Sequence, residues 1–578
     1  MKFILTSFLF ITFLSNCQPS NENSTADLFK DLITLILVEK AVNPPKTCSD
    51  RDNIVNPTDA LYTDQWHLNN TGSISGSVAG EDAKVLPVWS ANNKGDDVVI
   101  AVVDDGLETS HEDLGQNISS VLGYNYITNT TDANHKFSNS GHGTAVAGVA
   151  AARDLNGVGV RGAAPCAKLV GRNILEQSTI PTTVESDAMT KDIDKIFISN
   201  NSWGAPDNTG IYAPSNSTWR DAIDTGIAKG RNAKGALYMW AAGNGSQPCF
   251  PTGCSSGAIP ASTQIDNSNH DGQANYHGVL AIGGIGINGK KAAYSEEGAN
   301  LWVVAHTQGN DTSAYTKAIT TTDPIGDRGF NSSNPEICSD CTTNYSNRNY
   351  SNSFNGTSSA TPLAAGVVAL LLKAYPDLSW RDVREILAKS ARKNDSTDTD
   401  WSTNTAGYNI NHKYGFGAID ANNAITVAKT WTKITGTYAS ETSNTSGTLT
   451  ILDGNTTGVT QTVTFPASTV KKVEYVEINF TTNHTRFGDL DIILTAPTGT
   501  RSVITTQHFC IGSNSIGYSL CSNYSSGTTL RFGSARHLGE NPTGTWSLQV
   551  IDRNSSTLSG QTGTGSFSFN VTIKGRAN

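Results

Sequence analysis

Charged residues are scarce in this chain of 578 residues, at 16% of the total, and the balance of charge is negative. The formal net charge of −10 argues against nucleic acid as a main partner and favours basic substrates. Glycine, in contrast, is abundant at 54 residues, which suits a turn-rich exported protein better than a helical cytosolic one. The length allows two or three domains with separate cores.

The N-terminal apolar run is too short to span a bilayer. It extends from Phe3 to Leu14 behind one positive charge, a pattern typical of a signal peptide. Cys17 follows it as in a bacterial lipobox, so we expect a lipoprotein signal peptide over residues 1–17, with an ordinary signal peptide as the alternative. Residues 18–50 include a charged apolar stretch and are expected to form a tether or short helix. The protein is then exported and either lipid-anchored to a bacterial membrane, at the outer membrane or cell surface, or secreted.

The nine cysteines support export. Lipidation of Cys17 leaves eight, an even number that is compatible with four disulfides. Three pairs are close in sequence, and two cysteines are left over. The pairs are Cys249/Cys254, Cys338/Cys341, Cys510/Cys521 and Cys48/Cys166. Cys338 and Cys341 could also be half of a zinc site, but no second Cys or His pair is near them in sequence, so a disulfide is favoured.

Apolar, β-branched runs predict buried strands in the first two thirds of the chain. Residues 98–103 form such a run and end in Asp-Asp-Gly, which indicates a parallel strand that delivers a carboxylate at its C-terminal end. Residues 196–201 and 236–242 predict two more core strands.

Helices are expected between these strands. One covers residues 143–152 and puts His142 at its N-terminus, one covers residues 361–374 just after Ser358, and another covers residues 376–389. Alternating strands and helices predict an α/β domain over residues 51–433, with a doubly wound parallel sheet and a site at the C-terminal ends of its strands.

The composition changes near residue 430 to short alternating strands between Gly, Asn, Ser and Thr turns. Four such strands are expected at residues 470–480, 490–496, 546–552 and 566–573. This pattern predicts an all-β sandwich over residues 434–578.

Four separate motifs, in a fixed order, indicate one catalytic site. They are Val102-Val103-Asp104-Asp105-Gly106, Gly141-His142-Gly143-Thr144, Trp240-Ala241-Ala242-Gly243-Asn244-Gly245 and Gly356-Thr357-Ser358-Ser359-Ala360-Thr361-Pro362. Each motif alone is weak, but the four together in suitable local contexts are specific. The chain order Asp, His, Ser resembles that of the subtilase superfamily, and within it the kexin/furin-like branch.

Motifs in the C-terminal part extend the resemblance. Gly488-Asp489-Leu490-Asp491, residues 496–501 and residues 541–546 resemble the P domain that follows the catalytic domain in kexin-like proteases. The resemblance therefore implies a subtilisin-like α/β fold followed by a jelly-roll-type P domain. A generic binding β-sandwich is the alternative.

The resemblance gives each motif residue a role. A serine hydroxyl is a weak nucleophile until a base takes its proton. Ser358 is expected to be the nucleophile, His142 the general base and then acid, and Asp104 the carboxylate that orients the imidazole. Asn244 and the backbone N–H of Ser358 are expected to stabilise the oxyanion.

Acidic residues imply a preference for basic substrates. In the family, the position of Asp105 faces the residue before the scissile one, the P2 residue. Asp207 and Asp271 match carboxylates of the S1 pocket, which would pair with Arg or Lys at P1; the alternative is that both are solvated loop residues. Glu185 is a candidate S4 acid, while Asn139 replaces a second family S2 acid. We therefore expect strong selection for Arg at P1, moderate selection for a base at P2 and little beyond.

The resemblance also implies calcium. Asp59, Asp113 and Asn156, with backbone carbonyls around Arg153 and Val158, match the main structural site of the family. Asp207, Asp266 and Glu296 resemble a second site under the S1 pocket. Oxygen donors from separate loops suit a hard cation that takes about 6–8 ligands. The alternative is that these residues only form turns and caps.

Kexin-like proteases usually carry a propeptide that templates folding. Between Cys17 and the matched region there are fewer than about 40 residues, which is small for a domain. Folding is therefore either autonomous or assisted by a separate protein, and we expect the second. The leading hypothesis is a secreted, calcium-binding serine endopeptidase that cuts polypeptides after basic residues. A broad-specificity extracellular subtilase and a non-catalytic surface lipoprotein that binds through its β-sandwich are the alternatives.

Overall fold

The computed structural model describes residues 48, 59–137, 139–246, 264–309, 318–333, 344–512, 515–517, 521, 524–553 and 563–577. The chain divides into residues 1–52 and a compact unit of residues 53–578, and the account below concerns the second unit. Five predictions lie outside the described residues. They are the signal peptide, the lipidation of Cys17, the tether or short helix of residues 18–50, of which only residue 48 is described, and the Cys249/Cys254 and Cys338/Cys341 pairs.

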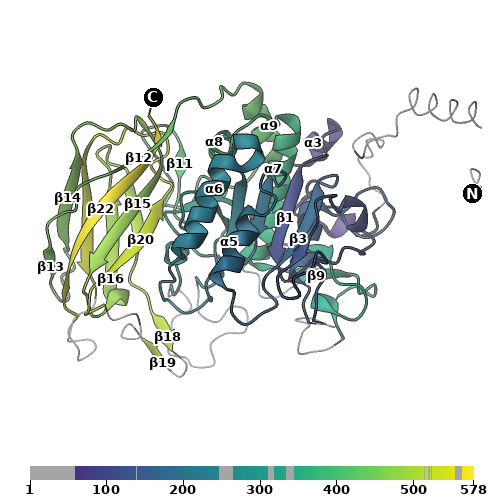
Figure 1. The fold of residues 1–578 in the computed structure, drawn as a ribbon, viewed down its shortest axis with the longest axis horizontal. Coiled ribbons are helices and arrows are strands. Elements are labelled where there is room, and N and C mark those ends of the chain that lie inside the picture. The colour runs from purple at the N-terminus through teal and green to yellow at the C-terminus, as the bar shows by residue number, and fades with distance from the viewer. Residues whose placement is uncertain are drawn as a thin grey trace, which may run out of the picture. The chain divides into compact units, whose positions relative to one another are not determined.

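A parallel sheet organises the first part of this unit (Figure 1). Within the described residues it has seven strands in the order β2-β3-β1-β4-β5-β6-β7, and every neighbouring pair is parallel. The strands are β1 (Val99–Asp104), β2 (Tyr124–Asn125), β3 (Lys168–Asn173), β4 (Ile198–Asn201), β5 (Leu237–Ala241), β6 (Val279–Ile285) and β7 (Leu301–His306). β1 lies between β3 and β4, where the strand order reverses, so its C-terminal end opens at the switch point of the sheet.

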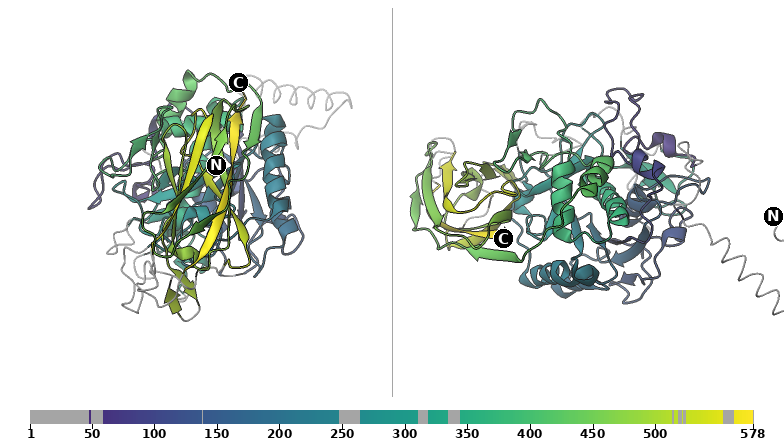
Figure 2. Two further views of the ribbon diagram at one scale, coloured as in Figure 1. Left: turned by 90° about the vertical axis from the view of Figure 1, so that its left-hand side faces the viewer. Right: turned by 90° about the horizontal axis from the view of Figure 1, so that it is seen from above.

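Helices cover both faces of this sheet (Figure 2). They are α3 (Leu86–Ser90), α4 (His142–Ala151), α5 (Thr182–Thr190), α6 (Ser217–Ala233), α7 (Gly356–Ala374), α8 (Trp380–Ser390) and α9 (Ala421–Lys429). α5 packs on α6, and α4 packs on α7, which also contacts β4, β5, β6 and β7. α7 is apolar and long enough to cross a membrane, but 83% of it is buried within the protein, as expected for a core helix.

Two helices begin at positions that differ from the prediction. α7 begins at Gly356 rather than after Ser358, so Ser358 lies inside its first turn. The expected start relied on Pro362, which lacks the N–H that would bond to the Ser358 carbonyl; the Ser202 hydroxyl supplies that bond instead. α8 begins after Ser379 rather than at residue 376, because Ser379 forms a capping box there.

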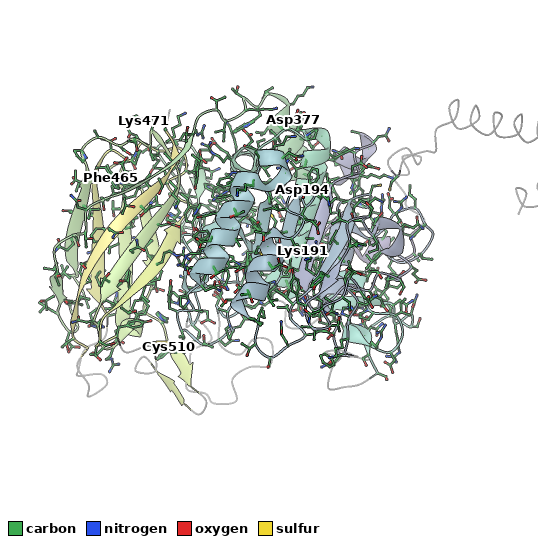
Figure 3. All side chains as sticks on the ribbon, viewed as in Figure 1. Lys191, Asp194, Asp377, Phe465, Lys471 and Cys510 are labelled. Atoms are coloured by element: carbon green, nitrogen blue, oxygen red, sulfur yellow. A yellow bond between two sulfur atoms is a disulfide. The ribbon has the colours of Figure 1, made fainter. Side chains whose placement is uncertain are left out.

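The C-terminal part consists of two antiparallel sheets around a second core. One contains β12 (Tyr438–Thr442), β13 (Leu449–Ile451), β15 (Lys472–Thr482), β20 (Thr528–Ser534) and β22 (Gly565–Arg576). The other contains β14 (Val459–Phe465), β16 (Leu490–Thr495), β17 (Arg501–Thr505) and β21 (Gly544–Asp552). Apolar side chains alternate inward along these strands, as the sequence pattern predicts, and Figure 3 shows Phe465 on one of them.

Short two-stranded sheets complete the described structure. They are β8 (Ile319–Thr322) with β9 (Tyr350–Phe354), β10 (Ser402–Thr403) with β11 (Asn409–Ile410), and β18 (Cys510–Gly512) with β19 (Ser515–Gly517). β9 leads directly into α7 and therefore helps to set the position of Ser358.

Candidate active site

Asp104 and His142 meet at the C-terminal edge of the parallel sheet. Asp104 is the last residue of β1 and is fully buried, and His142 is the first residue of α4. Nδ1 of His142 lies 2.8 Å from Oδ1 of Asp104, so the carboxylate holds the tautomer with the proton on Nδ1. Burial disfavours a charge on His142, but the charge and hydrogen bond of Asp104 outweigh it and raise the pKa of the imidazole to about 9.

Ser358 borders the same cavity as His142. Its hydroxyl donates to the Ser202 carbonyl at 3.2 Å, and the Ser202 hydroxyl donates to the Ser358 carbonyl at 3.0 Å. This reciprocal pair holds the first turn of α7 against the segment that follows β4. The Ser358 hydroxyl is therefore bonded to a backbone carbonyl, in the cavity that it borders together with His142.

The side-chain amide of Asn244 is oriented by α7. Its Oδ1 accepts the backbone N–H of Thr357 at 2.7 Å and the Thr357 hydroxyl at 3.0 Å. Nδ2 therefore faces the opposite way, 3.4 Å from Oδ2 of Asp207, and Asn244 borders the cavity with Ser358. A side-chain N–H beside a helix N-terminus is an arrangement that stabilises an oxyanion.

These side chains enclose a cavity of about 240 Å³. Two phenyl rings form one side of it: the centroids of Phe354 and Phe330 lie 5.4 and 6.4 Å from that of His142. Asp207, Asn244 and Ser358 also border it. The cavity therefore has an apolar wall, a carboxylate and a candidate catalytic pair.

Asp105 has a different set of partners from those expected of a substrate-binding residue. Its Oδ2 accepts the backbone N–H groups of Gly141 and His142 at 2.9 and 3.0 Å, and its Oδ1 accepts that of Gly143 at 2.8 Å. The side chain is only 16% exposed. The structure thus directs this carboxylate at the N-terminus of α4.

The two predicted S1 carboxylates have unequal access to the cavity. Asp207 is exposed at its edge and accepts the backbone N–H of Asn244 at 2.7 Å. Asp271 is 7% exposed and accepts the backbone N–H groups of Ala205 and Gln273 at 2.8 and 2.7 Å. Asp271 does not border the cavity that contains Ser358 in the described structure, and burial raises the pKa of its carboxyl group.

Glu185, the candidate S4 acid, lies on α5 and is buried. Its carboxylate accepts the side-chain N–H groups of Asn216 at 3.0 Å and Gln273 at 2.9 Å. It does not border the cavity that contains His142 in the described structure. A subsite role for Glu185 would require both hydrogen bonds to be exchanged for a substrate.

Asp266, Glu296 and Asp271 surround a second, much smaller cavity of about 20 Å³. This volume holds about one water molecule or ion. Burial, reinforced by repulsion from Asp207, raises the pKa of Asp266 to about 7, and burial with repulsion from Asp266 raises that of Glu296 well above its usual range. No Lys or Arg borders this cavity among the described residues, so a cation would relieve the repulsion. Asp266, Glu296 and Asp271 do not place three carboxylate oxygens within 4.8 Å of one another, so they do not form a complete set of metal ligands.

The other predicted calcium residues come from separate loops that are hydrogen-bonded to one another. Asp59 and Asp113 are buried, and Nδ2 of Asn156 donates to Oδ1 of Asp113 at 2.6 Å. The backbone N–H of Arg153 donates to the Asp113 carbonyl at 2.7 Å, and that of Val158 donates to Oδ1 of Asn156 at 3.2 Å. Burial raises the pKa of Asp113 to about 7. Two buried carboxylates and an amide form a donor set that suits Ca²⁺.

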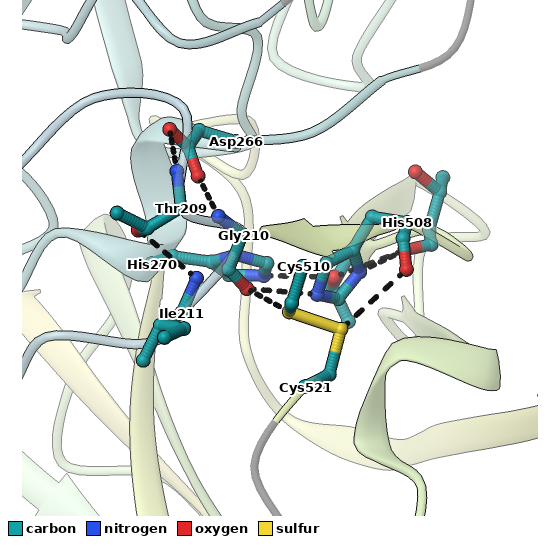
Figure 4. The surroundings of a disulfide bond; sticks show 10 residues. Thr209, Gly210, Ile211, Asp266, His270, His508, Cys510 and Cys521 are labelled. Atoms are coloured by element: carbon teal, nitrogen blue, oxygen red, sulfur yellow. Dashed lines mark hydrogen bonds between the residues drawn. A yellow bond between two sulfur atoms is a disulfide. The ribbon is translucent and has the colours of Figure 1, made fainter. Parts of the chain in front are cut away.

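Cys510 and Cys521 form a disulfide, as predicted (Figure 4). The carbonyl of Gly210 lies 3.1 Å from both Nε2 of His508 and Sγ of Cys510, and the N–H of Gly210 donates to Asp266. The disulfide therefore contacts the loop that also holds the small acidic cavity. Cys48 and Cys166 are each in the disulfide state.

Sequence comparison decides the family. Residues 95–417, more than half of the chain, match the subtilase family, and residues 473–564 match the proprotein convertase P-domain. The chain belongs to the subtilase family. The predicted family and fold class are confirmed, and the subtilase is a serine protease.

Relatives and solved structures agree with this assignment. The subtilase is 30% identical over 506 residues to neuroendocrine convertase 2 of Drosophila melanogaster, covering 86% of this chain and 69% of the relative. It is 31% identical over 528 residues to a dibasic-processing endoprotease of Schizosaccharomyces pombe, covering 88% and 66%. Its structure is similar to that of Aeromonas sobria serine protease in complex with the chaperone ORF2, with a TM-score of 0.75 and 25% identity over 92% of this chain and 99% of the other.

Sequence reasoning missed several residues that shape the site of this subtilase. Ser202 holds the Ser358 turn, Thr357 orients Asn244, and Phe330 and Phe354 flank His142. Thr357 lies next to Ser358, and this adjacency was the one available signal for it. The phenyl rings come from segments without a recognisable motif.

Proposed function

We propose that this subtilase is a calcium-binding endopeptidase that hydrolyses peptide bonds after basic residues. The observation that carries the proposal is that His142, Ser358, Asn244 and Asp207 border one cavity, with Asp104 bonded to the far side of the imidazole. A nucleophile, a base, an oxyanion donor and a carboxylate for a cationic side chain are thus available to one bound peptide.

In the proposed mechanism, the Ser358 hydroxyl turns from the Ser202 carbonyl towards Nε2 of His142. His142 takes the proton as Ser358 attacks the scissile carbonyl carbon, and Asp104 stabilises the resulting imidazolium. Nδ2 of Asn244 and the N–H of Ser358 bind the oxyanion of the tetrahedral intermediate. His142 then protonates the leaving amine, and a water molecule, activated by the same imidazole, releases the acyl group.

The proposed P1 preference depends on Asp207. Its carboxylate lies at the edge of the cavity, and a guanidinium or ammonium group would pair with it. An apolar side chain would leave this charge without a cationic partner and would bind less well. The names of the Drosophila and fission yeast relatives, a convertase and a dibasic-processing endoprotease, support the same preference.

Peptide substrates with Arg, Leu or Phe at P1 test the proposal. Wild type should prefer Arg, Ser358→Ala should lose activity on every substrate, and Asp207→Asn should lower the Arg-to-Leu ratio of kcat/KM by about tenfold or more. Asp377→Asn changes an exposed aspartate, labelled in Figure 3, and is the matched control. Wild-type activity of Ser358→Ala would remove the triad assignment.

A broad-specificity protease is a second candidate, favoured by one observation. Asp271 and Glu185 have partners within the protein, which leaves Asp207 as the exposed acid of the three. Equal kcat/KM for Arg and Leu at P1, with activity still dependent on Ser358, would establish this alternative.

Calcium and export form the remaining part of the proposal. Asp59, Asp113 and Asn156 would hold one ion and Asp266 with Glu296 another; the ions would cross-link loops around the site. The Cys510–Cys521 disulfide supports export, since disulfides persist mainly in oxidising compartments. Lipid attachment at Cys17 stays a prediction.

Assisted folding is proposed on the basis of the Aeromonas sobria protease, which was solved in complex with the chaperone ORF2. The denatured subtilase should recover little activity on dilution alone. Full spontaneous recovery in refolding buffer with calcium would contradict this part of the proposal, and recovery only with added ORF2 would support it.

A further inference from the structure

The N-terminus of α4 lacks a cap from its own sequence. Its N-cap residue is Gly141, which has no side chain, and the first N–H groups of any helix have no partner within the helix. His142 is the first residue of α4, so the uncapped end of the helix carries the imidazole. A group from outside the helix must therefore accept its first N–H groups.

Asp105 supplies the missing cap from the end of β1. Its two oxygens accept three consecutive backbone N–H groups, those of Gly141, His142 and Gly143, at 2.8–3.0 Å. A carboxylate at this position also faces the positive end of the helix dipole. The same residue follows Asp104, so one short segment binds the imidazole through one carboxylate and its helix through the next.

Neighbouring contacts fix this arrangement. The ring of His135 is 1% exposed; its Nε2 lies 2.6 Å from the Thr144 hydroxyl on α4, and its Nδ1 lies 3.3 Å from the Asp105 carbonyl and 3.6 Å from Oδ1. A Cβ atom on Gly143 would lie 2.0 Å from the Gly106 carbonyl, so α4 packs directly on the turn that contains Asp105. Small movements of this turn therefore move His142.

We propose that Asp105 is a positioning residue for catalysis, which holds His142 for proton transfer by capping α4, in addition to any contact with a basic P2 side chain. The inference rests on the proposed function of Asp104, His142 and Ser358. A substrate-binding role alone would leave the carboxylate free to face the substrate, whereas here its oxygens are bonded to the helix.

The titratable groups around His142 make the role measurable. Asp104 is bonded to Nδ1 of His142, Oδ1 of Asp105 lies 3.6 Å from Nδ1 of His135, and Asp207 borders the same cavity as His142. Loss of the Asp105 charge removes a negative group near the imidazole. The rise of activity on the acid side of the pH–activity profile, the acid limb, should therefore move to lower pH.

The test compares wild type, Asp105→Asn, Asp105→Ser and the control Asp377→Asn on two peptides with Arg at P1 and either Lys or Ala at P2. Asp105→Asn should lower kcat on both peptides by about tenfold or more, with KM for the Ala peptide within about twofold of wild type. Asp105→Asn keeps one acceptor oxygen but places an amide N–H against a helix N–H, whereas Asp105→Ser accepts one N–H without that repulsion and should recover part of kcat. Both variants should shift the acid limb to lower pH, whereas Asp377→Asn should shift nothing.

A pure subsite role gives a different result. If Asp105→Asn raises KM only for the Lys peptide, and kcat and the acid limb on the Ala peptide match wild type, the inference is wrong. Should Asp105→Asn fail to fold, Asp105→Ser decides: wild-type kcat and an unmoved acid limb would overturn the inference. Activity that survives Ser358→Ala would instead reject the proposed function, so the two failures are distinguishable.

Discussion

The charge of one imidazole depends on one buried carboxylate. Asp104 is fully buried and accepts both the His142 ring N–H and the Asp105 backbone N–H, so it stabilises the imidazolium at short range. The base must nevertheless be neutral before it accepts the proton of Ser358. Activity should therefore rise as pH increases through the pKa of His142, which lies above the usual value for histidine.

Asp104→Asn should both slow the enzyme and move this acid limb. The amide has no charge to favour imidazolium, so the midpoint should fall by about 1–3 pH units. It would also donate to Nδ1 and impose the wrong tautomer, so kcat should fall roughly 10³–10⁴-fold. A pH series of kcat/KM measures both effects, with Asp97→Asn, an exposed aspartate, as control. An unmoved midpoint would show that another group controls the limb.

Motifs predicted the roles of Asp104, His142, Ser358 and Asn244, because each lies in a short pattern whose local structure is set by adjacent residues. The partners of Asp105 and Glu185 were beyond such reasoning. Where a carboxylate points depends on which N–H groups the fold brings near it, and these come from α4 in one case and from Asn216 and Gln273 in the other.

At the scale of elements, α4 and β1 approach each other more closely than any side chain would allow. Gly143 faces the Gly106 carbonyl and the Cβ atom of Asp104, which a Cβ on Gly143 would meet at 2.0 and 2.9 Å. The close approach brings His142 within reach of Asp104. The prediction of a helix after His142 was correct, but the packing distance depends on both elements together.

Gly143→Ala should therefore separate α4 from β1 and inactivate the enzyme. The 2.0 Å contact is with backbone, which has no rotamer to change, so the helix end must move and kcat should fall by about 100-fold or more. Gly447→Ala, where the new Cβ would meet only Gln461 at 3.7 Å, is the matched control. Steady-state kinetics and thermal unfolding of both variants check this, and near-normal kcat for Gly143→Ala would contradict it.

Loops that carry acidic residues are the other elements that need support. Glu296 and Asp266 repel each other in a buried cavity, so Glu296→Gln should raise the midpoint of thermal unfolding in the presence of EGTA. Ca²⁺ at a hundredfold excess over Kd should raise the unfolding free energy of wild type by about 3 kcal/mol, and Glu296→Gln should lose part of this increase. Scans in CaCl₂, MgCl₂ and EGTA measure this, with Asp377→Asn as control. Equal midpoints of wild type in CaCl₂ and EGTA would remove calcium from the proposal.

At the scale of the molecule, the P domain is hydrogen-bonded to residues 269–272, the segment that contains the predicted S1 carboxylate Asp271. Asn269 exchanges two hydrogen bonds with the backbone of Gly533, at 2.7 and 2.9 Å, and the Arg531 guanidinium donates to the Gly272 carbonyl at 2.9 Å. Arg381 and Glu474 form a buried ion pair elsewhere between the two domains. The sequence predicted both domains, but these contacts join residues hundreds of positions apart and have no local signal.

The Cys510–Cys521 disulfide of the P domain contacts the loop of Gly210, and its removal should affect specificity as well as stability. Cys510→Ser/Cys521→Ser removes a covalent link between residues 11 positions apart and should lower the unfolding free energy by about 3 kcal/mol. Sγ of Cys510 contacts the Gly210 carbonyl, and the Gly210 N–H holds Asp266, so the loop that begins at Asp207 should also loosen. The Arg-to-Leu ratio at P1 should then fall, measured well below the unfolding midpoint. Thr464→Ala/Thr545→Ala, an exposed cross-strand pair in the same domain, is the control. A loss of stability with an unchanged Arg-to-Leu ratio would show that the P domain supports the fold without shaping the S1 pocket.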